Sequence, residues 1–290
     1  MKNKNITALS IIVPAFNESE RLAQSVRTIL DYLNQQEFKS ELIVVDDGST
    51  DATAKVAEEN FTSAGSVTAR VVRYEENRGK GYAVRTGLLA AQGDMALFTD
   101  ADLSTPITET PKLIGPIERG EVDLTFGSRA LDRSLIGVHQ PWRREQGGRV
   151  FNLIVRLSTG LPFWDTQCGF KAFRMSVCRS LAETATIDRF GFDVELLFIA
   201  HLAGLRLKEI PVRWDHNEGS KVSVLRDSRR MINEVRLIRR QAKKGIYAEG
   251  IKAIQEAASL EFIARTSRSH KELSEKDSIN EMLHTPSKSW

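Results

Sequence analysis

Cysteine is scarce in this chain, since Cys168 and Cys178 are the only two among 290 residues. With no ligand-spaced partners they predict neither a disulfide scaffold nor a zinc site, and they suit a reducing compartment. Long hydrophobic runs are also missing, because no segment reaches the roughly 18 uninterrupted apolar residues of a membrane span. Residues 1–5 are polar, and the apolar run that ends at Pro14 is too short for a secretory signal. We therefore expect a cytoplasmic protein whose contact with a membrane, if any, is peripheral.

Neither sign of charge is in large excess, with 41 Lys and Arg against 38 Asp and Glu and a net charge of +3. That excess is too small to predict nucleic-acid binding by itself. The hydrophobic fraction of 41% can support a sizeable core and excludes wholesale disorder. At about 150 residues per domain, the length predicts one large domain, or one domain with an appendage.

Short apolar runs alternate with helical patterns along the chain. In the first part, strands are expected over 9–13, 42–45, 67–74 and 95–99, with helices over 20–35, 51–60 and 81–92. In the second part, helices are expected over 109–119, 150–159 and 194–203, with strands over 122–127, 168–173 and 207–214. Apolar strands joined by helices at this spacing predict an α/β fold, in which helices cover both faces of a mostly parallel, Rossmann-like sheet.

Polar turns follow three of the expected strands. They are Pro14–Glu18, Asp46–Ser49 and Asp100–Asp102. Open parallel sheets bind ligands in the crevice outside the carboxyl ends of their strands. Three polar turns at one edge of the sheet therefore favour a binding site over three unrelated turns.

Asp100 and Asp102 are two residues apart, so their side chains point to the same face of an extended segment. Two carboxylates there can hold one hard divalent cation, Mg²⁺ or Mn²⁺, with phosphate oxygens and water in the other positions. The alternative is a turn and helix cap, because Ser104, Thr105 and Pro106 are good capping residues. The neighbouring polar turns favour the metal site.

Two further turns each have a functional and a structural interpretation. Asp46 and Asp47 either form a tight turn, with Ser49 starting a helix, or supply a carboxylate that accepts a hydrogen bond from a nucleobase N–H. The segment Arg78–Gly81 opens a helix and offers backbone N–H groups and positive charge to a phosphate. It is not a G-x-G-x-x-G or P-loop pattern, so neither a dinucleotide site nor a kinase-type site is supported.

Eight motifs occur in order between about Ser10 and Val222: VPAFNE, VVDDGSTD, RGKGYAVRTG, TDADLSTP, GSR, DTQCGFKAF, FDVELLF and EGSKV. In this set the chain resembles the inverting family 2 glycosyltransferases of GT-A fold. Within them it resembles the dolichyl-phosphate β-glucosyltransferase-like branch, which makes polyprenyl-phosphate sugars. The first two motifs are general to the fold, whereas DTQCGFK, FDVELL and GSK together are narrower.

The resemblance implies a role for many of these residues. It assigns the nucleotide-sugar pocket to Pro14, Ala15, Phe16, Glu18, Val45, Asp47, Lys80, Asp100, Ala101 and Asp102. It assigns the metal to Asp100, Asp102 and Ser104, and the acceptor phosphate to Arg129, Arg144, Arg149 and Lys221. The choice among the arginines of the 143–149 stretch stays open. The candidate catalytic residues are Asp102, Arg129, Arg144, Arg149 and Glu195.

The implied reaction moves glucose from UDP-glucose to a polyprenyl phosphate and gives a β-linked product. A phosphate monoester is already anionic near pH 7, so it needs arginines to position it and no strong general base. Each arginine could instead form a surface ion pair. Another donor such as GDP-mannose, or a glycan acceptor, would keep the same fold, and a membrane-surface binding module is the non-enzymatic alternative. Nucleic acid is not expected as a partner, because the acidic turns would repel it.

A basic segment follows the expected catalytic domain. From Lys221 to Lys244, nine Lys and Arg stand against Asp227 and Glu234, with apolar residues interleaved at near-helical spacing. Such a helix suits an anionic membrane surface, or else packs on the sheet with a solvated basic face. We therefore expect a glycosyltransferase domain over 1–222, a basic amphipathic helix over 223–250 and a polar, partly disordered tail over 251–290. The protein would then lie peripherally on the cytoplasmic membrane face.

Overall fold

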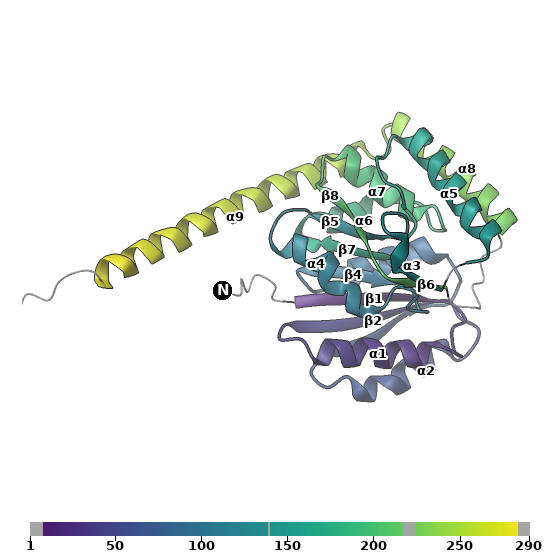
Figure 1. The fold of residues 1–290 in the computed structure, drawn as a ribbon, viewed down its shortest axis with the longest axis horizontal. Coiled ribbons are helices and arrows are strands. Elements are labelled where there is room, and N and C mark those ends of the chain that lie inside the picture. Colours follow the sequence, from purple (N-terminus) through teal and green to yellow (C-terminus); the bar gives the residue numbers. More distant parts are fainter. Residues whose placement is uncertain (1–7, 139, 217–223, 284–290) are drawn as a thin grey trace, which may run out of the picture.

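The computed structural model describes residues 8–138, 140–216 and 224–283, and its first half alternates strands and helices as expected (Figure 1). The strands are β1 (Ala8–Ala15), β2 (Lys39–Asp47), β3 (Thr68–Tyr74) and β4 (Met95–Thr99). The helices between them are α1 (Leu22–Asn34), α2 (Thr53–Asn60), the 3₁₀ turn η1 (Phe61–Ser63) and α3 (Lys80–Ala90).

The second half departs from the expected alternation. It contains η2 (Ile107–Glu109), α4 (Thr110–Glu118), β5 (Leu124–Ser128), η3 (Arg133–Leu135), β6 (Ile136–Val138), α5 (Trp142–Thr159), β7 (Phe170–Arg174), α6 (Met175–Thr184), α7 (Phe192–Leu202), β8 (Leu207–Pro211) and β9 (Trp214–Asp215). Helix α5 begins eight residues earlier than expected, so the arginine-containing stretch 143–149 is helical. The strand expected over 207–214 is divided, because β9 leaves the main sheet to pair with β6.

The main sheet has seven strands in the order β3-β2-β1-β4-β7-β5-β8. Neighbouring strands are parallel, except that β7 is antiparallel to both β4 and β5. This confirms the α/β fold with a mostly parallel sheet. The antiparallel β7 also brings the chain that precedes it to the carboxyl end of β4.

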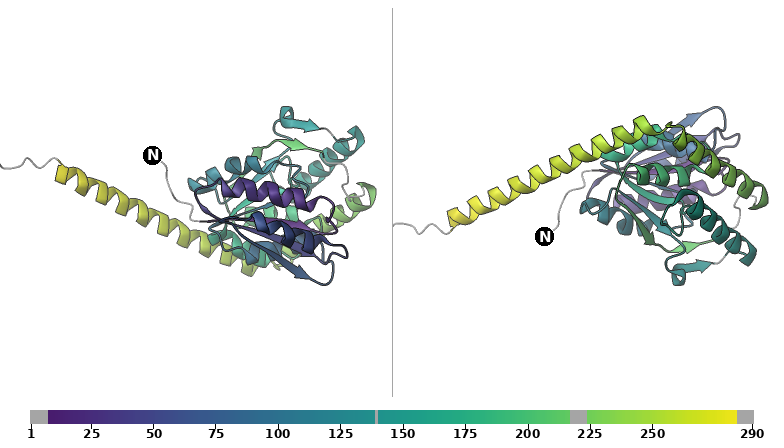
Figure 2. Two further views of the ribbon diagram at one scale, coloured as in Figure 1. Left: turned by 90° about the horizontal axis from the view of Figure 1, so that it is seen from below. Right: turned by 90° about the horizontal axis from the view of Figure 1, so that it is seen from above.

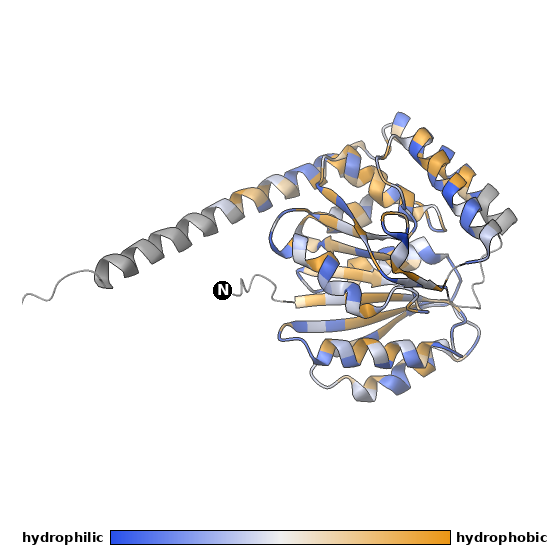
Figure 3. Ribbon diagram, in the orientation of Figure 1, coloured by the Kyte–Doolittle hydropathy of each residue, from blue (hydrophilic) through white to orange (hydrophobic). Residues whose placement is uncertain are grey.

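Side chains that alternate along β1 divide the core between the two faces of the sheet. Ile11 and Val13 pack with apolar residues of α1 and α4, whereas Ile12 packs with residues of α3, α6 and α7. All three are fully buried, and each burial stabilises the fold by about 1.5–3 kcal/mol. Figure 2 shows helices on both sides of the sheet, and Figure 3 shows apolar residues concentrated on the strands and on helix faces.

Two helices follow the sheet, α8 (Val224–Lys243) and α9 (Ala248–Leu283). Residues 251–283, which fall in the expected polar and partly disordered tail, belong to α9. Its first turns, with Ile254 buried, pack against α6, and the rest extends away from the body (Figure 1). In the part of the chain that the structure describes, no helix has a stretch both long and apolar enough to cross a bilayer.

Candidate active site

The polar turns after β1 and β2 lie side by side and are bonded to each other. The Asn17 N–H donates to Ser49 Oγ (2.9 Å), and the Thr50 N–H donates to Asn17 Oδ1 (2.9 Å). The Glu18 N–H donates to Thr53 Oγ1 (2.8 Å). Parallel pairing of β1 with β2 places both strand ends at one edge, as the sequence predicts.

Asp47, the predicted nucleobase acceptor, holds the turn before α3. Its carboxylate accepts hydrogen bonds from Tyr74 Oη (2.7 Å), Asn77 Nδ2 (2.8 Å) and the backbone N–H groups of Arg78 and Gly79 (2.8 and 2.9 Å). Burial and the neighbouring Asp47 carboxylate raise the pKa of Tyr74, so its hydroxyl stays a donor. A nucleobase contact at Asp47 stays a prediction, and it requires one of these internal donors to give way.

Most other members of the predicted nucleotide-sugar pocket from β1 and β2 are buried in the core. Pro14, Ala15 and Val45 are buried, whereas Phe16 is 36% exposed at the end of β1. Glu18 accepts a hydrogen bond from Arg21 Nη2 (2.8 Å). Phe16 is therefore the member of this set that presents an apolar surface at the sheet edge.

The two carboxylates after β4 lie among cations. Asp100 Oδ1 is 2.5 Å from Lys80 Nζ at the start of α3, and Asp102 Oδ2 is 3.9 Å from Arg21 Nη1. The Ser104 N–H donates to Asp102 Oδ1 (3.0 Å), which closes the turn. Burial lowers the pKa of Lys80, but Asp100 and Asp193 outweigh this effect and raise it, so the ammonium is charged. Ala101 and Ser104, which belong to the same turn, are buried.

The arrangement fits a divalent cation held by two protein carboxylates. Asp100 and Asp102 emerge from the same turn, and neither lies in the core. Among the described residues, no group of three or more His, Cys, Asp or Glu is placed to hold a metal ion. The other ligands would therefore be diphosphate oxygens and water, and the Ser104 contribution stays a prediction.

Gly169, which the sequence analysis did not single out, lies against Asp100. A Cβ at this position would be 2.5 Å from the Asp100 Cγ, so only glycine leaves the carboxylate in place. The antiparallel pairing of β7 with β4 creates this contact, with Phe170 opposite Thr99. The DTQCGF motif was the available signal, but the partner of its glycine is 69 residues away.

Arg129, predicted to bind the acceptor phosphate, forms a two-pronged pair with Asp165. Its Nε and Nη2 donate to Asp165 Oδ2 (2.7 Å) and Oδ1 (2.8 Å). Burial raises the pKa of Asp165, but the Arg129 charge outweighs burial and the net pKa is lowered. Asp165 therefore orients Arg129 and occupies one edge of its guanidinium group.

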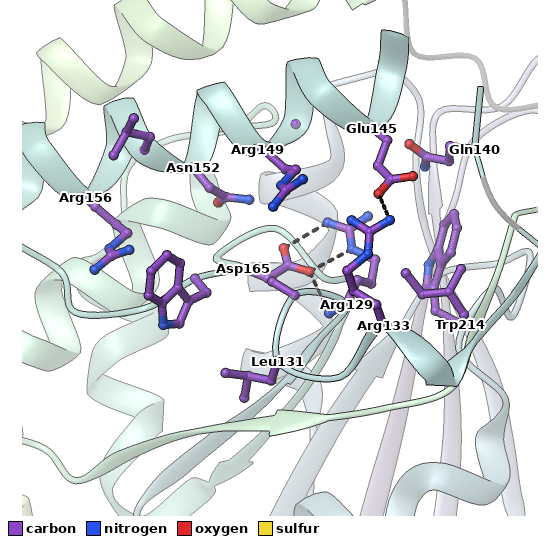
Figure 4. Close-up of a pocket in the computed structure, with 15 residues that line it drawn as sticks. Arg129, Leu131, Arg133, Gln140, Glu145, Arg149, Asn152, Arg156, Asp165 and Trp214 are labelled. Atoms are coloured by element: carbon purple, nitrogen blue, oxygen red, sulfur yellow. Dashed lines mark hydrogen bonds and ion pairs between the residues drawn. The ribbon is translucent and has the colours of Figure 1, made fainter. Parts of the chain in front are cut away.

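A cavity of about 580 Å³ opens beside this pair (Figure 4). Four arginines line it together with apolar, aromatic and amide side chains: Arg129, Arg133, Arg149, Arg156, Leu131, Leu153, Trp164, Trp214 and Asn152. Arg149, Asn152 and Arg156 come from one face of α5. Its acidic members, Asp165 and Glu145, are paired with Arg129 and Arg133. The lining thus combines positive charge with apolar surface.

Two links join the cavity to the Asp100 edge. The loop 165–169 begins at the cavity with Asp165 and ends at Gly169 against Asp100. Trp214 lines the cavity, and the Asp215 N–H donates to the Ser104 carbonyl oxygen (2.8 Å). The carboxylate edge and the arginine cavity are therefore neighbouring parts of the candidate site.

Two of the four predicted acceptor-phosphate residues can be located at the cavity. Arg129 and Arg149 both line the cavity. The side chain of Arg144, and Lys221 as a whole, lie outside the described residues. Arg133 and Arg156 join the cavity without having been predicted, because their positions depend on how η3 and α5 face each other.

Glu195, a candidate catalytic residue, is buried inside α7. Its carboxylate accepts hydrogen bonds from the Thr186 and Ile187 N–H groups (2.9 and 2.7 Å), from Thr186 Oγ1 (2.7 Å) and from Tyr247 Oη (2.7 Å). It is fully shielded from solvent and does not line the cavity. These contacts support a structural role, in which Glu195 ties α7 to the α8–α9 junction.

A buried ion pair between Lys171 and Asp193 influences Lys80. Lys171 Nζ is 2.5 Å from Asp193 Oδ1, and both residues are buried. Burial raises the pKa of Asp193, an effect that the charges of Lys171 and Lys80 partly offset. The Asp193 carboxylate thus adds to the negative charge around the Lys80 ammonium.

Comparisons with known proteins agree with this fold and site. The sequence model of the family described as "Glycosyl transferase family 2" matches residues 10–182. A dolichyl-phosphate beta-glucosyltransferase of Homo sapiens is 36% identical over 229 residues, which cover 74% of this chain and 69% of the human protein. The protein of the same name from Dictyostelium discoideum is 32% identical over 249 residues, 82% of this chain and 76% of that protein.

Solved structures share the fold. The crystal structure of glucosyl-3-phosphoglycerate synthase from Mycobacterium tuberculosis, in complex with Mn²⁺, UDP-glucose and phosphoglyceric acid, aligns with a TM-score of 0.56 at 24% identity. The alignment covers 80% of this chain and 79% of that one. Together with the ordered motifs and the relatives, these matches confirm the resemblance drawn from the sequence. The chain belongs to glycosyl transferase family 2 and is a hexosyltransferase of GT-A-like α/β fold.

Proposed function

We propose that this enzyme transfers glucose from UDP-glucose to the phosphate of a polyprenyl lipid, such as dolichyl phosphate. The observation that carries the proposal is the cavity beside the Arg129–Asp165 pair, in which four arginines and several apolar side chains meet. Arginine pairs with phosphate oxygens in two-pronged fashion, and the apolar lining suits the first units of a prenyl chain. The names of the human and Dictyostelium discoideum relatives support this acceptor.

The donor would bind along the edge formed by β1, β2 and β4. Phe16 presents apolar surface to the base, and Lys80 presents an ammonium group to the diphosphate. A divalent cation, Mg²⁺ or Mn²⁺, held by Asp100 and Asp102 would neutralise the charge that develops on the leaving UDP. Lys80 exchanges its contact with Asp100 for one with phosphate when the donor binds.

The chemistry at the sugar is a single displacement. An oxygen of the acceptor phosphate forms a bond to the anomeric carbon while the bond from that carbon to the UDP oxygen breaks, and the electron pair leaves with UDP. The acceptor oxygen is already anionic, so no side chain has to remove a proton. The arginines position this oxygen, with Arg129 oriented by Asp165. Attack opposite the leaving group converts an α-linked donor into a β-linked product.

The direct test measures radiolabel transfer into an organic phase. Purified protein with Mg²⁺ or Mn²⁺ is incubated with labelled UDP-glucose or GDP-mannose, with and without polyprenyl phosphate in detergent. Label from UDP-glucose alone, dependent on both metal and lipid, is the expected result. Label from GDP-mannose instead would overturn the donor. Metal-dependent hydrolysis of the donor with no label in the organic phase would overturn the lipid acceptor.

Two variants separate the donor side from the acceptor side. Asp102→Ala removes a metal ligand and should abolish transfer and metal-dependent UDP binding. Arg149→Ala removes a charged hydrogen-bond donor worth about 1.5–3 kcal/mol, so the KM for polyprenyl phosphate should rise roughly 10- to 100-fold while UDP binding is retained. Arg119→Ala is the matched control, because Arg119 is an exposed arginine paired with Glu121 outside the cavity. Equal effects of the Arg149 and Arg119 changes would contradict the acceptor site.

A further inference from the structure

Helix α5 exposes a line of large apolar side chains. Trp142 is 72% exposed and Leu157 is 79% exposed, and Val150 and Leu153 are more than half exposed. Positions 142, 150, 153 and 157 follow the i, i+8, i+11, i+15 spacing of one helix face. Phe151 is buried on the opposite side, so packing against the domain does not require this line. Figure 3 shows hydrophobic and hydrophilic segments alternating along α5.

An aromatic residue from the next loop extends the line. Trp164 is 55% exposed, and the Arg156 guanidinium lies 3.8 Å from the centre of its ring. Tryptophan beside arginine is typical of a surface that is apolar at one level and meets headgroups at the next. We call Trp142, Val150, Leu153, Leu157 and Trp164 the α5 ridge.

Cations flank the α5 ridge on two sides. Arg149 and Arg156 lie between the ridge and the cavity on α5 itself. Helix α8 packs against α5 and carries exposed basic residues: Arg230, Arg236, Arg239, Arg240 and Lys243. The carboxylate of Glu234, on the same helix, faces inward and accepts a hydrogen bond from the Gly191 N–H (2.6 Å). The helix that carries the ridge and the helix packed against it therefore both present cations.

We infer that the α5 ridge is the membrane-contacting surface of this protein and that its partner is an anionic bilayer. Its apolar side chains enter the headgroup region, while the arginines of α5 and the basic residues of α8 contact lipid phosphates. Leu153 belongs to both the ridge and the cavity lining, so the cavity opens at the membrane surface. The statement that the cavity opens at the membrane rests on the proposed lipid acceptor. A lipid phosphate would then reach the arginines of the cavity without leaving the bilayer.

The test compares two pairs of exposed apolar residues that lie outside the cavity. Trp142→Ser with Leu157→Ser alters the ridge, and Leu260→Ser with Phe262→Ser alters an equally exposed pair on α9. Sedimentation with vesicles of phosphatidylcholine and phosphatidylglycerol measures binding, and vesicles of phosphatidylcholine alone measure the contribution of charge. We expect the ridge variant to bind anionic vesicles at least tenfold more weakly than the wild type, and the α9 variant to bind normally.

Activity on a short, water-soluble prenyl phosphate separates this inference from the proposed function. Both double variants should retain wild-type transfer to that acceptor. Ridge-dependent vesicle binding without transfer to any polyprenyl phosphate would overturn the acceptor and leave the membrane surface standing. Equal vesicle binding by the ridge variant and the wild type would overturn the inference. A self-associating wild type whose dimer is lost in the ridge variant, with no vesicle binding, would reassign the ridge to contact between two copies and also overturn it.

Discussion

Replacing Gly169 by alanine gives the sharpest test of the geometry at the carboxylate edge. The added Cβ would lie 2.5 Å from the Asp100 Cγ, whereas ordinary contact requires 3.4 Å or more. The Asp100 carboxylate must therefore move by about 1 Å, which alters its contact with Lys80. A misplacement of about 1 Å in a reacting group can lower the rate about 100-fold.

We expect kcat for Gly169→Ala to fall about 100-fold, and the Mg²⁺ or Mn²⁺ concentration for half-maximal rate to rise. Stability should change little, because the Asp100 side chain is about one-third exposed and can rotate away. Label transfer measured across a metal titration gives both quantities, and urea unfolding gives the stability.

Gly115→Ala is the matched control for this substitution. Gly115 lies within α4, and a Cβ there would meet only the end of the flexible Arg119 side chain. That variant should keep full activity and gain up to about 1 kcal/mol from the helix preference of alanine. If Gly169→Ala showed wild-type turnover and metal requirement, the close approach of β7 to Asp100 would have no bearing on catalysis and the reasoning would fail.

Three further predictions concern buried polar groups. Glu195→Gln should lower stability by about 1–3 kcal/mol in urea unfolding, because an amide cannot accept all the hydrogen bonds that the carboxylate accepts; unchanged stability with lost turnover would restore a catalytic role. Asp165→Asn should also lower the free energy of unfolding. Because Arg129 lowers the pKa of Asp165 from its ordinary 3.8, the difference in stability between wild type and variant should be complete above about pH 4 and shrink below it. A difference in stability that does not depend on pH would refute the ion pair. Burial raises the pKa of Cys168 to about 11 and also raises that of Cys178, so Ellman's reagent at pH 8 should label neither thiol until the protein is unfolded; rapid labelling of the native protein would contradict their burial.

The fold class and the location of the site follow from patterns that are local in the sequence. Apolar runs such as 9–13 and 95–99 mark buried parallel strands, and polar residues directly after them mark the carboxyl edge. Asp100 and Asp102 could be predicted to lie close together, because they are two residues apart in one short turn. The motif order then identified the family, which the comparisons confirm.

Tertiary structure alone decided which distant residues meet. Gly169 reaches Asp100, and Asp165 reaches Arg129, because β7 runs antiparallel between β4 and β5. No periodicity within a single segment reports such a pairing, since strand order depends on packing across the whole sheet. The exposure of the α5 ridge was likewise decided by the tertiary structure. Its apolar residues match the spacing of a buried helix face, and only the burial of Phe151 on the opposite side shows that this face is exposed.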